Sequence, residues 1–61
     1  MSPLEVAVRE LDRLGFLHLA DRLVAGETAG ELLSWEPPAP ARRILLVLES
    51  LEAGRLRAVI S

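Results

Sequence analysis

The chain has 61 residues, of which 51% are hydrophobic, and it carries a formal net charge of −2 with one histidine and no cysteine. This length accommodates one domain at most, the lack of cysteine excludes disulfide bonds, and a single histidine argues against a structural zinc site. The sequence therefore predicts no cofactor and no metal, and the absence of a basic tail or stripe argues against a nucleic-acid-binding module.

The hydrophobic content is high for so short a chain, because a domain of this size buries only about 60% of the surface that its unfolded form exposes. We therefore expect a protein interface, with the chain forming a homodimer or larger homo-oligomer; another protein is the alternative partner. The longest apolar run, residues 44–48, is far shorter than the ~20 residues of a membrane span. The N-terminal residues lack the apolar core of a signal peptide, which predicts a cytoplasmic location.

A first helix is expected over residues 3–14. Ser2 is a preferred N-cap residue, Pro3 suits the first helical position, and Gly15 is placed to end the helix in a left-handed conformation. Apolar residues at helical spacing follow one face of this segment. A second helix is expected over residues 16–25, where a further glycine ends it.

A third, short helix is expected over residues 29–35, because Thr28 and Glu31 have the spacing of a capping box. The proline-rich connector 36–40 then breaks the helix, since proline lacks the backbone donor and restricts the residue before it.

The fourth helix is expected over residues 40–53, with Gly54 as its C-terminal cap. Residues 55–60 are ambiguous: a short helical turn is favoured, and an edge strand is the alternative. The fold class predicted for the whole chain, 1–61, is all-α, a small helical bundle of three to four helices that dimerisation completes.

His18 could pair with Asp21 as half of a metal or acid–base site. Such a site needs further ligands or a nucleophile, and His18 lies on the polar face of its helix, so a solvated surface histidine is the favoured interpretation. Glu49 and Glu52 could meet in a site shared between subunits, but no base or nucleophile accompanies them. We therefore expect a protein without enzymatic activity.

Two features of the connector region have both a functional and a structural interpretation. Residues 37–42 spell P-x-x-P-x-R, a pattern that polyproline-binding domains accept, although a stiff connector between helices would use the same prolines. Trp35 could be an interface hot spot, although a tryptophan that covers the core and stacks on neighbouring prolines is favoured.

Helices 16–25 and 29–35 superficially resemble a helix-turn-helix. The second of them offers no arginine or lysine for phosphates, and Glu31 would be repelled. The alternative to an interaction module is a small DNA-associated regulator that pools arginines across a dimer, namely Arg42, Arg43, Arg55 and Arg57. Salt-dependent binding to duplex DNA would distinguish the two.

The fourth helix has two apolar faces on a helical wheel. The wider stripe, assigned to the core of the subunit, contains Ile44, Val47, Leu48 and Leu51. The second face is predicted to form the homodimer interface, through Leu45, Leu46, Arg42, Glu49, Glu52 and Ala53. Two such helices would pack antiparallel about a two-fold axis between the adjacent leucines, which would bring Arg42 of one subunit to Glu49 of the other.

Overall fold

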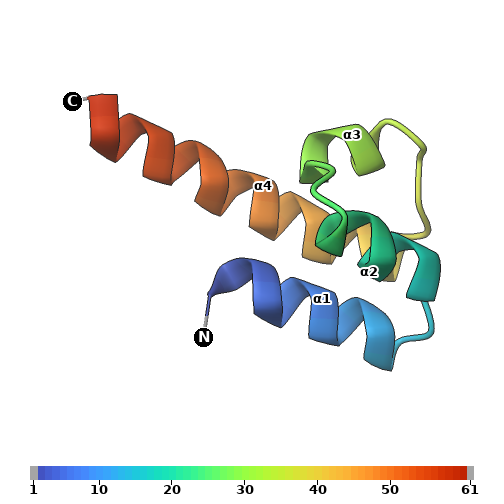
Figure 1. Cartoon of the computed structure of the whole chain (residues 1–61). Helices are drawn as coiled ribbons and strands as arrows, with labels where there is room; N and C mark the ends of the chain where they lie inside the picture. The colour runs from blue at the N-terminus through green and yellow to red at the C-terminus, as the bar shows by residue number, and fades with distance from the viewer. Residues whose placement is uncertain (1, 61) are drawn as a thin grey trace.

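The computed structural model describes the backbone of residues 2–60 and the side chains of residues 2–54. Residues 2–60 form four α-helices and no strand, which confirms the predicted all-α class (Figure 1). The helices are α1 (Pro3–Arg13), α2 (Leu17–Val24), α3 (Ala29–Leu33) and α4 (Ala39–Ile60). Within the described part, no helix is both long and apolar enough to cross a bilayer.

The start of α1 is the one that the sequence predicts. Ser2 lies in the extended region, and its hydroxyl accepts a hydrogen bond from the backbone N–H of Glu5 at 3.2 Å. Pro3 occupies the first helical position, where its missing N–H removes no helical bond. Side chain and backbone together therefore fix where α1 begins.

A Schellman turn ends α1 and starts α2. Gly15 has a φ of +92°, a conformation in which an L side chain would be strained. The N–H of Phe16 donates to the carbonyl of Leu11 at 2.8 Å, and the N–H of Gly15 donates to that of Asp12 at 3.1 Å, the paired bonds of this motif. Phe16 then packs against the core, so the turn sets the angle at which α2 returns.

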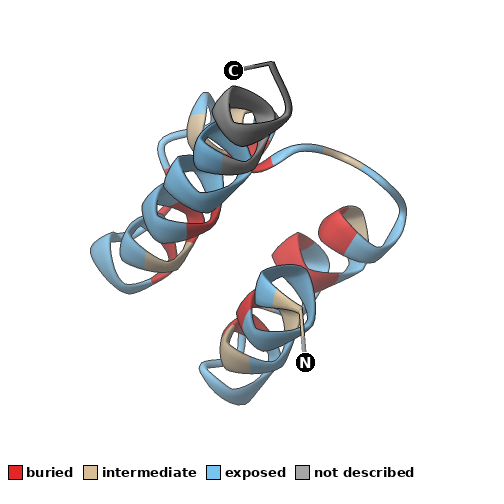
Figure 2. Ribbon diagram, turned by 90° about the vertical axis from the view of Figure 1, so that its left-hand side faces the viewer, coloured by how far each residue is buried: buried red, intermediate tan, exposed pale blue. Residues whose placement is uncertain are grey.

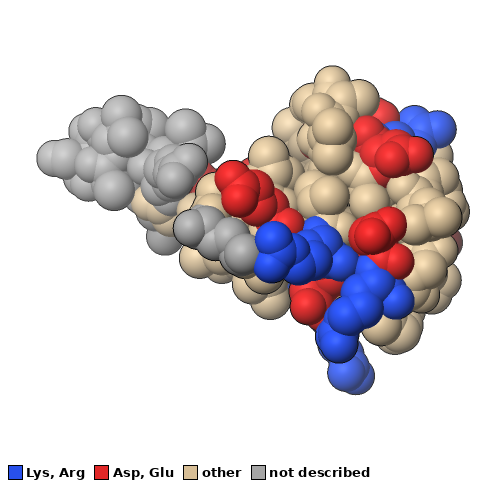
Figure 3. Space-filling view, turned by 60° about the horizontal axis from the view of Figure 1, so that its bottom comes forward, with Lys and Arg blue, Asp and Glu red and all other residues tan. Residues whose placement is uncertain are grey.

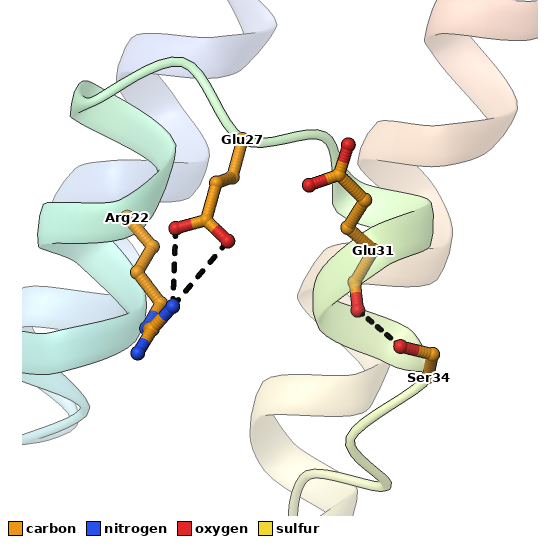
Figure 4. A network of polar contacts seen from close by, with 4 residues as sticks. All are labelled: Arg22, Glu27, Glu31 and Ser34. Carbon is orange, nitrogen blue, oxygen red and sulfur yellow. Dashed lines mark hydrogen bonds and ion pairs between the residues drawn. The ribbon is translucent and has the colours of Figure 1, made fainter.

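The turn after α2 repeats this backbone geometry at Gly26, whose φ is +105°. The residue that follows is Glu27, where an apolar residue often stands in this motif. Its carboxylate instead lies 3.2 Å from a guanidinium nitrogen of Arg22, in a part-buried ion pair (Figure 4). The same guanidinium stacks 4.0 Å from the ring centroid of Trp35, beyond the end of α3. Arg22 thus connects α2 to the chain that follows α3.

Helix α3 is capped by Thr28, whose hydroxyl accepts from the N–H of Glu31 at 3.2 Å, as the sequence predicts. It ends at Leu33, two residues before the predicted end. The N–H of Trp35 donates to the carbonyl of Leu32 three residues back, which tightens the last turn out of α-helical geometry. Glu36 then takes a positive φ of 53° directly before the prolines.

Helix α4 is longer than predicted. Gly54 does not end it, and the helical backbone continues to Ile60, so residues 55–60 are helical, the favoured of the two alternatives, but as a continuation of α4 and not as a separate turn. A glycine ends a helix when it takes a left-handed conformation, as Gly15 and Gly26 do, and no positive φ occurs at Gly54.

The four helices form two layers. α1 packs on α2, α3 packs on α4, and α1 also packs on α4 (Figures 1 and 2). Figure 2 shows the two pairs side by side, with the buried residues on the sides that face each other. The core consists of Ala7, Leu11, Leu19, Ala20, Leu23, Ala29, Leu32, Ala41, Leu45 and Leu48. Among residues 2–54, no polar or charged side chain is buried.

Candidate protein interface

The core face of α4 differs from the predicted one. Leu45, which the sequence assigned to the dimer interface, is completely buried within the subunit. It belongs to the same core cluster as Ala29 and Leu32 of α3, the helix that packs on this side of α4. The sequence analysis placed only the first two helices against α4. The assignment of Leu45 to the dimer interface was wrong because α3 also packs on α4.

The stripe assigned to the core is only partly buried. Leu48 is buried and Ile44 is half-buried, but Val47 is 60% exposed and Leu51 is 50% exposed. The assignment of Val47 and Leu51 to the core of the subunit was therefore also wrong. Leucine and valine have similar hydrophobicity, so the burial of each one on this helix depends on which neighbouring helix covers its side.

The remaining residues of the predicted interface all lie on the surface. Leu46 is 47% exposed, and Arg42, Glu49, Glu52 and Ala53 are exposed as well. Leu46 is separated from Leu45, which points into the core. The structure therefore does not bring the two leucines together on one exposed face.

An apolar groove runs between α1 and α4, on the side where Val47 and Leu51 are exposed. Its volume is about 410 Å³. The groove is lined by Pro3, Val6, Ala7, Glu10, Ile44, Val47, Leu48 and Leu51. Val6, which breaks the polar side of the first predicted helix, is 45% exposed here. In the sequence, Val6 is an apolar residue among the charged residues of this helix, which indicates an apolar contact on this side of α1 but does not say what lies opposite.

The groove continues around the N-terminal turn of α1. A second hollow of about 220 Å³ shares Pro3, Leu48 and Leu51 with the first, and adds Ser2, Leu4 and Glu52. Glu10 and Glu52 are thus the charged side chains at the two hollows. We call the combined surface the α1/α4 groove. Within residues 2–54, no arginine or histidine lines it.

A third hollow, between α1 and α2, has a different character. Its volume is about 590 Å³, and charged side chains of both signs line it, among them Arg9, Asp12 and Asp21. Figure 3 shows basic and acidic side chains interspersed over the face that α1 presents. Because charges of both signs line this hollow, it lacks the uniform apolar character of the α1/α4 groove.

The other candidate residues do not assemble into a site. His18 is exposed, and among the described side chains no three of the histidine, aspartate and glutamate residues could hold a metal ion together. Pro37, the first residue of the P-x-x-P-x-R pattern, is buried, so the pattern cannot be presented whole to a partner. Trp35 is 54% exposed and is covered on one face by Arg22, an arginine that sequence reasoning did not connect with it.

No protein-family model, curated protein or solved structure matches this chain.

Proposed function

We propose that the chain is a non-enzymatic helical protein–protein interaction module that works as a homo-oligomer, with the α1/α4 groove as its docking surface. The observation that carries the proposal is the cluster of half-exposed apolar side chains from two helices, Val6, Val47 and Leu51, at 45%, 60% and 50% exposure. Contiguous apolar patches of this kind, rimmed by polar residues, mark interaction sites in soluble proteins.

The chemistry of the described residues supports binding rather than catalysis. Catalytic acids and bases generally lie in desolvated surroundings or beside other charges, which shift their pKa values. Here the α1/α4 groove contains only carboxylates, Glu10 and Glu52, beside apolar groups and the Ser2 hydroxyl. That hydroxyl already accepts the capping hydrogen bond of α1.

The groove lining alone is a small interface. Burying the exposed half of Val6, Val47 or Leu51 gains roughly 1 kcal/mol for each side chain. Association costs about 4–15 kcal/mol in lost translational and rotational freedom. A stable assembly therefore needs additional apolar surface next to the groove.

The test is the oligomeric state of a matched pair of variants. Val47→Glu places a charge in the groove, and Val24→Glu makes the same change at a 72% exposed valine of α2, outside the groove. Analytical ultracentrifugation should give a dimer or larger species for the wild type and for Val24→Glu, and a folded monomer for Val47→Glu. A wild-type chain that is a folded monomer throughout the micromolar range contradicts the proposal.

A further inference from the structure

None of the described residues in the second half of α4 is buried within the subunit. Residues 49–54 are all exposed, whereas Ala41, Leu45 and Leu48 of the first half are buried. Helix α4 has 22 residues and α1 has 11, which correspond to lengths of about 33 Å and 16 Å. Figure 1 shows the C-terminal part of α4 extending past the N-terminal end of α1. Because isolated helical segments of this length are marginal in water, a packing partner for this half is expected.

The charges of the chain are divided between the body and the last turns of α4. Residues 2–54 contain all nine acidic side chains but only five of the seven arginines, a net charge of −4, whereas residues 55–60 contain two arginines and no acid, a net charge of +2. The charged groups that line the α1/α4 groove are two carboxylates: Glu10, which also pairs with Arg13 at 2.7 Å, and Glu52. A basic segment is therefore the electrostatic complement of this groove.

The sequence of the last turns also has the apolar spacing of a groove-binding helix. Ala58 and Val59 stand seven and eight residues after Leu51, so by helical spacing they continue the face of α4 on which Leu51 is exposed, as the anchors of a helix that occupies an apolar groove do. The lengths agree as well. The groove follows α1 from Pro3 to Glu10, about 10 Å of helix, and residues 55–60 span about 8 Å.

We propose that the α1/α4 groove of one copy binds the last turns of α4, residues 55–60, from a second copy, and that the exchange is reciprocal. The two α4 helices run antiparallel about a two-fold axis close to Leu51 and Gly54. Each copy then contributes both a groove and the segment that fills the other groove, as an isologous interface requires. This inference rests on the proposed function and names the occupant of its docking surface.

The antiparallel arrangement also uses the exposed middle of α4. Leu51 lies near the axis, where the second copy covers it. A Cβ added to Gly54 would meet no atom within 4 Å, so this position leaves room for the crossing helix. The pairing supplies the additional apolar surface that the groove lining alone lacks.

Cross-linking tests which positions meet, because the chain contains no cysteine. Val47→Cys and Ala58→Cys are made as separate full-length variants, mixed, and treated with a short bismaleimide. The heterodimeric cross-link is expected to dominate the mixture. Leu17→Cys, an exposed position on α2, replaces Val47→Cys as the control and should give no cross-link with Ala58→Cys. Equal yields from the two mixtures overturn the inference.

Charge reversal tests the electrostatic part. Arg55→Glu combined with Arg57→Glu should raise the dissociation constant of the dimer by about two- to fivefold for each lost contact. Adding Glu10→Arg and Glu52→Arg to the same chain should return the constant towards that of the wild type. The readout is sedimentation across a dilution series.

The possible outcomes separate the two proposals. If the wild type dimerises, Val47→Glu dissociates it and the arginine variants dimerise as the wild type does, the groove is an interface but residues 55–60 are not its occupant. If the wild type is a folded monomer throughout, both the homo-oligomeric function and the reciprocal exchange are wrong.

Discussion

Residues 41–48 of α4 supply three buried side chains to the core, while the described residues that follow, 49–54, supply none. The two segments differ in composition, since Leu51 is the one large apolar residue among residues 49–54. They also differ in how much lies beside them: α3 and α1 pack on α4, and its C-terminal part then extends past the N-terminal end of α1. Hydrophobicity along a helix thus shows which side chains could be buried, and the neighbouring helices decide which are.

The largest expected effect comes from truncating one leucine in each half. Leu45→Ala removes a completely buried side chain and should lower the free energy of unfolding by about 2–5 kcal/mol. Leu51→Ala changes a half-exposed side chain and should alter the stability of the monomeric Val47→Glu variant by no more than about 0.5 kcal/mol. Urea denaturation followed by circular dichroism measures both. Equal losses would show that both halves of α4 are packed within one subunit.

Two glycines sharpen the comparison, because one ends a helix and the other lies within one. Gly54→Ala should stabilise the monomeric variant by up to about 1 kcal/mol, since alanine favours the helical backbone and the site is open. Gly15→Ala should destabilise it by about 1–2 kcal/mol, since the φ of +92° strains an L residue. Thermal unfolding distinguishes the opposite signs. A loss of stability for Gly54→Ala would contradict a continuous helix through this position.

The smallest effect is expected at His18, which serves as a reference for an exposed side chain. His18→Ala should change the free energy of unfolding by no more than about 0.5 kcal/mol, because the side chain is exposed. Denaturation of the purified variant measures this. A loss above about 1 kcal/mol would mean that His18 cannot serve as the reference for substitutions of exposed side chains.

Features that depend on residues close together in the sequence were predicted correctly, whereas features that depend on distant segments were not. The Ser2 and Thr28 caps and the left-handed Gly15 involve residues within five positions of one another, and all three were predicted. The end of α4 was missed, because a glycine permits a left-handed cap without requiring one. The proline break after α3 was predicted from the same kind of local restriction.

The groove was beyond local reasoning for a different reason. The placement of Leu45 and Val47 depends on α3, which is far from them in sequence and covers only one side of α4. A helical wheel shows which faces of a helix are apolar. When a helix has two apolar faces, the wheel cannot tell which of them is buried within the subunit. Val6 was visible as an exception to the pattern of its helix, but without the position of α4 it identified no site.

The stacking of Arg22 on Trp35 has a practical consequence. Trp35 is the only tryptophan, and its ring follows α3 in one layer while the guanidinium that covers it belongs to α2 in the other. Its fluorescence therefore responds to separation of the two layers. Neither α1/α4 hollow includes Trp35, so the emission should change little when copies associate. One native fluorophore can thus follow the opening of the subunit independently of its assembly, without a label.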